Sequence, residues 1–338
     1  GSYKLVYEAQ KDLAINIIYN DKDISLAFNP EDVINSIFFY ESENNTLFYD
    51  YVKTISTEYD ELNNIQKKYY IDKSKELARK YNSKLAKIKV YQNYFDKQAK
   101  GKIAQHFISA FQKPISEKPL NSLVEKLDFF KNNYLKNINF QDSTLRNSAF
   151  LMDRLNEYIF DLNEAMAKKK NQAIDTDMVD VALSKIADSR FKNEVVYSLT
   201  SSAFDPYSST YDNLLDHLFR NYYTKLAEEA KNENFTVMVQ AKLNSILGKK
   251  APNINFEDSS LYSIQSDSTL IIFWSTTCSH CLKEIPKVYE EFANSKNLKG
   301  LPESIVKLKN LDVINVLGSG DGTFYIPFQI LEEIECGG

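Results

Sequence analysis

Hydrophobic residues recur at two different spacings along the chain, and the change in spacing predicts how the chain is organised. Between residues 1 and 30 the apolar positions alternate, as at Tyr3 and Leu5, and β-rich runs follow at 13–20 and 23–30. Alternation of this kind predicts short strands with one buried face. Two or three strands are marginally stable alone, so we expect them to pack on the helical part next to them in sequence. The pattern favours a plain half-buried sheet over a ligand-binding β-module.

From residue 31 to residue 247 the apolar spacing becomes three and four, which predicts a helical domain. The first long helix covers 47–69, and a second runs from 77 past Gly101 toward Phe111. Prolines at 114 and 119 then predict a break. Further helices are predicted at about 120–136, 144–168, 175–188, 190–202 and 209–232, with Asp142 as an N-cap and the lysines at 168–170 at a helix C-terminus, where cations oppose the dipole.

A different pattern begins after the glycine at position 248, which we expect to end the helical part. Four consecutive apolar residues, 270–273, predict a strand that is buried on both faces and ends at Trp274. After a short polar turn come Cys278 and Cys281, and both should lie in the first turn of an amphipathic helix. Free backbone N–H groups and the helix dipole there lower the pKa of the first thiol from about 8.5 to ~3.5–7. The apolar positions of that helix are Leu282, Ile285, Val288, Tyr289 and Phe292.

Around these cysteines the sequence resembles the thioredoxin superfamily and, within it, the TlpA/ResA-type thiol-disulfide oxidoreductases. The resemblance implies a thioredoxin-like α/β domain and an enzyme that exchanges disulfides with protein partners. Cys278 would attack as a thiolate, and Cys281 would resolve the mixed disulfide. The shared pattern is F-W-x-x-x-C-x-x-C-x-x-E-x-P, which is met by Phe273, Trp274, Cys278, Cys281, Glu284 and Pro286.

The resemblance also implies supporting roles for other residues. Trp274 would shield the pair, and Glu284 would tune the thiol pKa values or relay a proton, unless it is only a surface charge. His280 would stabilise the thiolate or act as a solvated spacer. Pro327 is the candidate for the cis-proline that faces the cysteines in this family, although so few residues follow it that the chain is either truncated or rebuilt at its end. Cys336 is interpreted as a tail thiol, with mixed-disulfide formation as the alternative.

The front part of the chain extends the resemblance. Runs at 15–30 and 138–159 are similar to segments that precede the thioredoxin-like domain in large TlpA-type proteins of Bacteroidota. The resemblance therefore implies an α+β multidomain chain, with a remnant of a small β-domain at 1–30, a helical domain at 31–247 and a thioredoxin-like domain at 248–338. It also implies export to the periplasm, often with a lipid anchor.

Composition narrows the classes of function. The 338 residues are 43% hydrophobic, which is ample for packed cores. A net charge of −5 without a basic stripe argues against nucleic acid as a partner, and no apolar run approaches the ~18 residues of a membrane span. Zinc at the cysteines would need two more ligands at a spacing that the remaining cysteine and histidines lack, so no metal or cofactor is expected. The opening Gly1-Ser2 is typical of cloning, so an export signal or anchoring cysteine would precede Tyr3.

Two other functions stay open at this point. The helical part is far larger than a thioredoxin fold requires, so the chain is alternatively a periplasmic binding or scaffold module with a regulatory redox pair. A cytosolic redox sensor is a third option. Catalytic turnover of a protein disulfide separates the enzyme from both alternatives.

Overall fold

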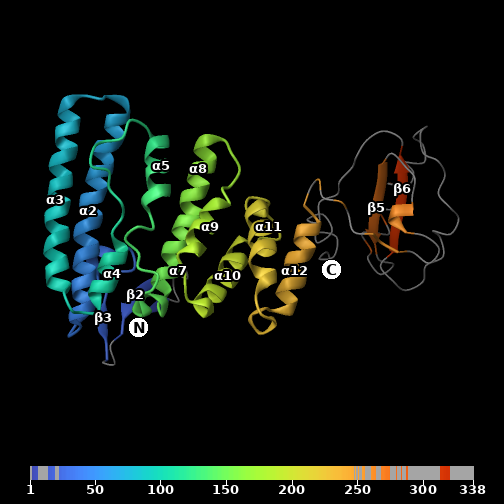
Figure 1. The fold of residues 1–338 in the computed structure, drawn as a ribbon, viewed down its shortest axis with the longest axis horizontal. Helices are drawn as coiled ribbons and strands as arrows, with labels where there is room; N and C mark the ends of the chain where they lie inside the picture. The colour runs from blue at the N-terminus through green and yellow to red at the C-terminus, as the bar shows by residue number, and fades with distance from the viewer. Residues whose placement is uncertain are drawn as a thin grey trace. The chain divides into compact units, whose positions relative to one another are not determined.

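The computed structural model shows a mostly helical chain with short antiparallel strands (Figure 1). Two compact units are present: Gly1–Phe204 with Asn213–Lys231, and Asp205–Asp212 with Asn232–Gly338. No helix in the described part of the chain combines the length and the apolar composition needed to cross a bilayer. The residues that the structure describes are 2–6, 14–19, 23–246, 248, 250, 253–255, 260–263, 268–274, 279, 283, 287 and 313–319.

The strands of the first unit form two antiparallel pairs. β1 (Ser2–Val6) pairs with β2 (Ala14–Ile18). β3 (Ser25–Ala27) pairs with β4 (Phe38–Tyr40), and the short helix α1 (Val33–Ser36) lies between them in sequence. The predicted strands are thus confirmed, but β4 falls in the region predicted to be helical. Its three aromatic residues suit a strand, but a run of three residues is too short to show the alternation of apolar and polar positions that predicts one.

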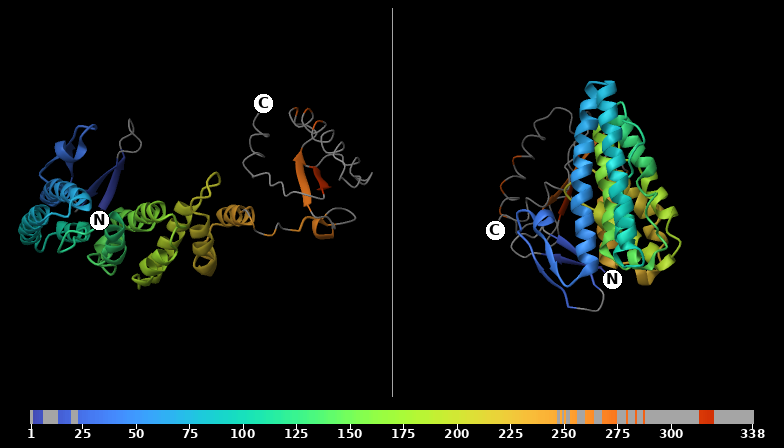
Figure 2. Two further views of the ribbon diagram at one scale, coloured as in Figure 1. Left: turned by 90° about the horizontal axis from the view of Figure 1, so that it is seen from above. Right: turned by 90° about the vertical axis from the view of Figure 1, so that its left-hand side faces the viewer.

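The strand pairs pack on the helices, as predicted for elements too small to be stable alone. The support is α2 (Glu43–Ile71), where the Tyr49 hydroxyl donates a hydrogen bond of 3.0 Å to the Asn16 carbonyl. From β1, the Lys4 ammonium lies 2.5 Å from the Asp153 carboxylate. Figure 2 shows both strand pairs on one side of the helices of this unit.

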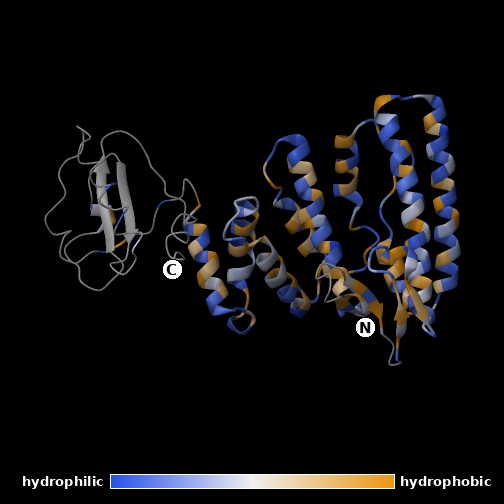
Figure 3. Ribbon diagram, turned by 180° about the vertical axis from the view of Figure 1, so that it is seen from behind, coloured by the Kyte–Doolittle hydropathy of each residue, from blue (hydrophilic) through white to orange (hydrophobic). Residues whose placement is uncertain are grey.

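Two long antiparallel helices form the largest element of the first unit. α3 (Lys75–Ala99) comes directly after α2, and its N-cap Ser74 accepts a hydrogen bond from the Leu77 N–H. Hydrophobic positions recur between hydrophilic ones along both helices, as Figure 3 shows, and the hydrophobic ones meet in the core. The buried side chains of this interface include Tyr51, Ile55 and Leu62 from α2 and Tyr81, Leu85 and Ile88 from α3.

The prediction that the second helix continues past residue 101 is wrong. α3 ends at Ala99, Gly101 has a φ of +76°, and α4 (Ala104–Phe111) begins after it. A positive φ is accessible to glycine at little cost and is incompatible with a continuing right-handed helix. The break after α4 at the two prolines is confirmed, because residues 112–122 contain no helix or strand.

The remaining helices of the first unit follow the predicted order, with bounds that differ from the predicted ones. Asp142 is confirmed as an N-cap, because its carboxylate accepts hydrogen bonds from the backbone N–H groups of Thr144 and Leu145. The lysines at 168–170 do end a helix. The helix predicted at 144–168 is divided, however, into α6 (Ser143–Arg146), α7 (Ala149–Asn156), the π-helix η1 (Glu157–Leu162) and α8 (Asn163–Lys170); the others are α5 (Leu123–Asn133), α9 (Asp177–Ser184), α10 (Ser189–Ala203) and α11 (Asp212–Asn221).

Three buried amide side chains hold non-helical segments against helices in the same way. Each donates its NH₂ group to the backbone carbonyl of one residue and accepts a hydrogen bond from the N–H of that residue, as a neighbouring strand would. Because both groups are used, the orientation of each amide is fixed. The pairs are Asn45 with Ile18, Gln66 with Leu120, and Asn163 with Asp175.

In the second unit, α12 (Glu233–Asn244) lies within the range predicted to be helical and before Gly248, which was expected to end the helical part. The helix predicted at 209–232 ends earlier, at Asn221, and short 3₁₀ turns come after it. β5 (Ser268–Trp274) confirms the predicted strand before the cysteines, and β6 (Val313–Ser319) is a further strand beyond them in sequence. These two strands pair antiparallel, with Ile271 opposite Val316.

Candidate functional site

The structure describes one residue of the predicted redox site, Trp274. Trp274 is the last residue of β5, as predicted, and its register partner on β6 is Val313. The other predicted site residues lie outside the described residues, so their roles stay predictions. They are Cys278, His280, Cys281, Glu284 and Pro327, together with the third cysteine, Cys336.

Three described residues beyond the strand have helical backbone. Ser279, Lys283 and Lys287 are all helical, and all three are exposed. A spacing of four places them on one face of a helix. This face is polar and turned to solvent, which agrees with the predicted amphipathic helix and with a strand-to-helix junction between Trp274 and Ser279.

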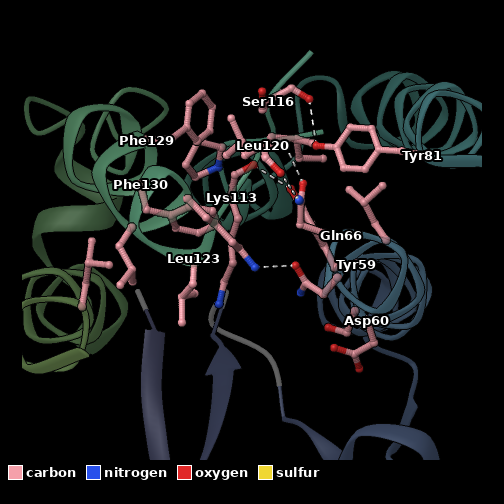
Figure 4. Close-up of a pocket in the computed structure, with 18 of the residues that line it drawn as sticks. Tyr59, Asp60, Gln66, Tyr81, Lys113, Ser116, Leu120, Leu123, Phe129 and Phe130 are labelled. Carbon is pink, nitrogen blue, oxygen red and sulfur yellow. Dashed lines mark hydrogen bonds between the residues drawn. The ribbon is translucent and has the colours of Figure 1, made fainter. Parts of the chain in front are cut away.

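The first unit contains a cavity of about 340 Å³ that the sequence analysis did not predict (Figure 4). It lies between α2, α5 and the segment 112–122. Leu123, which forms part of its wall, remains 40% exposed, so the cavity is partly open to solvent. Apolar side chains form most of the lining: Leu62, Phe111, Pro114, Ile115, Leu120, Leu123, Leu127, Phe129, Phe130 and Leu162.

Hydrogen bonds from α2 and α3 fix the irregular wall of the cavity. The Tyr59 hydroxyl donates to the Lys113 carbonyl at 2.6 Å, and the Tyr81 hydroxyl donates to the Ser116 carbonyl at 3.0 Å. Burial raises the pKa of Tyr81 to about 12, so this phenol keeps its proton at neutral pH. With the Gln66–Leu120 amide pair, these bonds hold the segment at three successive points and give the cavity a preformed wall.

α5 forms the opposite wall, and it is an unusually exposed helix for its composition. None of its side chains is fully buried, although Leu127, Phe129 and Phe130 all face the cavity. Lys126 lies on the same apolar stripe, three residues after Leu123 and four before Phe130. Its ammonium donates to the Asn63 side-chain oxygen at 2.8 Å and lies 5.6 Å from the Phe130 ring centroid.

Of the two lysines that line the cavity, one has a carboxylate partner in the described ranges and the other has none. Lys113 pairs with Glu157 at 2.8 Å, and Arg154 pairs with the same carboxylate at 2.6 Å. Burial would raise the pKa of Glu157, but the two cations outweigh it and hold that pKa below its usual value. Lys126 pairs with no carboxylate in the described ranges. Burial, and then repulsion from nearby lysines, lowers the pKa of Lys126.

A π-helix borders the cavity. η1 begins at Glu157, the partner of Lys113, and ends at Leu162, which lines the cavity. π-Helical turns are rare and occur frequently at functional sites. The π-helix is therefore a second unusual feature of this cavity, beside the lysine that has no carboxylate partner in the described ranges.

Two of the three histidines serve to join helices. His217 Nε2 lies 2.7 Å from the Asp180 carboxylate, and the Asn221 amide nitrogen lies 3.0 Å from its Nδ1, so both ring nitrogens have a partner. His106 pairs with the N-cap Asp142 at 2.5 Å. In the described part of the chain, no group of three His, Cys, Asp or Glu side chains has a geometry suited to a metal ion.

One signal in the sequence pointed to the cavity. A lysine at position 126 interrupts an apolar stripe whose neighbours at spacings of three and four are Leu123 and Phe130. A cation on the apolar face of a helix costs free energy unless it has a partner or a function.

Comparisons of the chain with protein families, with curated proteins and with solved structures gave no match.

Proposed function

We propose that this protein is a thiol-disulfide oxidoreductase of the TlpA/ResA type, with a thioredoxin-like C-terminal domain. The observation that supports the proposal most is the junction at Trp274, where a strand leads into residues that are helical at 279, 283 and 287. The sequence predicts that Cys278 and Cys281 lie in the first turn of that helix. A thiolate is best stabilised at this position, because free backbone N–H groups and the helix dipole both favour negative charge.

The proposed reaction needs only the two cysteines and a partner disulfide. The Cys278 thiolate attacks one sulfur of the partner, so the partner's S–S bond breaks and a mixed disulfide forms. The Cys281 thiolate then attacks the Cys278 sulfur, closes the internal disulfide and releases the partner as a dithiol. Two electrons pass from the cysteine pair to the partner, whose sulfurs take up protons, and a second dithiol protein restores the reduced pair.

The finer assignments belong to the same proposal. Glu284 would exchange protons with the pair, Trp274 and His280 would modulate access and thiolate stability, and Pro327 would face the cysteines. Protein thiols and disulfides are the proposed partners, with a periplasmic location and a lipid anchor in the precursor. No cofactor is needed, because the sulfurs themselves carry the electrons.

Catalytic turnover tests the proposal. With excess dithiothreitol, catalytic amounts of the protein should accelerate reduction of the insulin interchain disulfides, and Cys278→Ser should abolish the acceleration. When dithiothreitol is removed before insulin is added, reduced Cys281→Ser should trap a mixed disulfide with insulin, because the resolving thiol is absent. Cys336→Ser is the matched control and should keep full activity. A rate no higher than that of dithiothreitol alone, in either direction of exchange, would contradict the proposal.

A second candidate function is a binding module with a regulatory redox pair. The observation that favours it is the preformed cavity of the first unit, which disulfide exchange does not use. In that case the cysteines would change state without turnover.

A further inference from the structure

We propose that the cavity between α2, α5 and residues 112–122 is a binding site for a small monocarboxylate with an apolar body. The carboxylate would pair with the Lys126 ammonium, and the body would lie against Leu127, Phe129 and Phe130 (Figure 4). The volume of 340 Å³ lies at the lower end of the range of about 300–1,000 Å³ that is usual for small-molecule sites. This site is independent of the cysteine pair.

The charge of the ligand is inferred from Lys126. Its ammonium is half-buried and has the Asn63 oxygen as its hydrogen-bond acceptor, whereas an ammonium has three donors. Lys67 and Lys113 repel it, so the local field favours an anion. Lys113 already pairs with Glu157, so Lys126 is the lysine of the lining that has no carboxylate partner in the described ranges. One charge matches a monoanion, and the lining contains no arginine for the bidentate contacts that a phosphate prefers.

The apolar body is inferred from the lining and from α5. Four of the helix's apolar residues line the cavity without being fully buried, so a bound hydrocarbon would complete their burial. The polar groups of the opposite wall are already satisfied, because Tyr59, Gln66 and Tyr81 bond to the main chain of residues 113–120. A ligand therefore needs few polar groups beyond its carboxylate.

A cationic ligand is not supported by the same walls. Asp60 is the one carboxylate among the described lining residues, and it is exposed to solvent. Two lysines line the cavity with it, and the carboxylate of Glu157 is held by Lys113 and Arg154. Lys67 and Lys113 are thus the charged groups that act on Lys126, and Asp60 is the carboxylate of the lining.

Isothermal titration of the whole chain with straight-chain acids tests the proposal. Hexanoate, octanoate and decanoate are the probes, and octanamide and octylammonium are their neutral and cationic counterparts. We expect one site per chain and a preference for octanoate over octanamide of about tenfold to a hundredfold, because a charge-assisted hydrogen bond is replaced by a neutral one. Equal affinity for octanoate and octanamide, or no saturable binding of any acid at millimolar concentrations, would overturn the proposal.

Variants locate the site. Lys126→Met keeps the length of the side chain and should weaken octanoate by about tenfold or more while leaving octanamide unchanged. Leu127→Trp, which places a bulkier side chain in the cavity, should weaken both. Lys80→Met is the matched control, because Lys80 lies on the exposed face of α3 and pairs with Glu76 away from the cavity. Circular dichroism and melting curves check that each variant is folded, and an effect of Lys80→Met equal to that of Lys126→Met would reject the site.

The test is separate from that of the redox function. Cys278→Ser should bind octanoate as the unmodified protein does, whereas Lys126→Met should keep full insulin-reductase activity. Loss of turnover with intact binding, or the reverse, therefore identifies which proposal has failed.

Discussion

The side-chain amide of Gln66 exchanges two buried hydrogen bonds with the main chain of Leu120. The amide donates to the Leu120 carbonyl at 2.7 Å and accepts from the Leu120 N–H at 3.0 Å. Residues 112–122 have no regular structure to satisfy their own backbone groups, so α2 supplies the partner. One side chain thus attaches an irregular segment to a helix and shapes the wall of the cavity.

Replacing this amide with an apolar side chain of similar length should be costly. We expect Gln66→Met to lower the free energy of unfolding by about 2–4 kcal/mol, because two buried backbone groups of Leu120 lose their partners. Urea unfolding followed by circular dichroism measures the change. Gln98→Met, at an exposed position of α3, is the control and should stay within about 0.5 kcal/mol. Equal midpoints for the two variants would show that the segment is held by other contacts.

Much of the helical part could be predicted from sequence because local spacing determines it. The stripes of α2 and α3 are regular over many turns, and Asp142 marks its own helix start. What failed depended on single residues or on partners distant in sequence. Gly101 ends a helix through its φ angle, and β4 exists because β3 lies beside it.

The two candidate sites also differ in whether a local sequence pattern predicts them. The cysteine pair is a local pattern, so Cys278 and Cys281 could be identified from a stretch of a few residues. The cavity is built from three segments brought together by side chains such as Tyr59 and Gln66, and no local pattern predicts their meeting. Only Lys126, out of place on an apolar stripe, gave a sign of it.

The buried ion pair between α2 and α3 should make stability depend on acid pH. Glu58 accepts from Lys84 at 2.8 Å and from Lys87 at 2.7 Å. Burial would raise the pKa of Glu58, but the two lysines outweigh it, so the folded-state pKa lies below the usual 4.5. The stabilisation is therefore fully present above pH 4.5 and is lost as the pH falls through the folded-state pKa.

Glu58→Gln tests this dependence. At pH 7 we expect a loss of about 2–3 kcal/mol, because charged hydrogen bonds are replaced and Lys84 stays largely buried. The difference from the unmodified protein should shrink as unfolding is measured at successively lower pH. Glu76→Gln removes an exposed pair on α3 and should leave the unfolding midpoint unchanged at pH 7. A constant difference between Glu58→Gln and the unmodified protein from pH 7 to pH 3 would contradict the expected titration.

The proposed redox pair predicts an order of thiol reactivity. In the proposed site Cys278 would begin the helix and Cys281 would lie one turn further in, so alkylation of the reduced protein at mildly acidic pH should label Cys278 first. Glu284→Gln should lower the apparent pKa of the cysteines and slow exchange, because a like charge and a proton relay are both removed. Mass spectrometry of labelled peptides and the pH dependence of alkylation give both answers. Preferential labelling of Cys281 or Cys336 would reverse the assignment, and unchanged titration would make Glu284 a surface charge.

Lys126 should lower the stability of the ligand-free protein, because its cation is half-buried. Its lowered pKa means that the folded chain holds this proton less tightly than the unfolded chain, whose lysine keeps a pKa near 10.5. The unfolded state therefore binds more protons between the two pKa values, and stability should rise with pH in that window.

Lys126→Met removes a half-buried cation, so we expect it to stabilise the protein by on the order of 1 kcal/mol at pH 7. Urea unfolding from pH 7 to pH 10.5 should show this advantage shrinking as the unmodified lysine loses its charge, and octanoate affinity of the unmodified protein should fall over the same range. A destabilised Lys126→Met variant would mean that the contacts with Asn63 and Phe130 outweigh the cost of burying the charge.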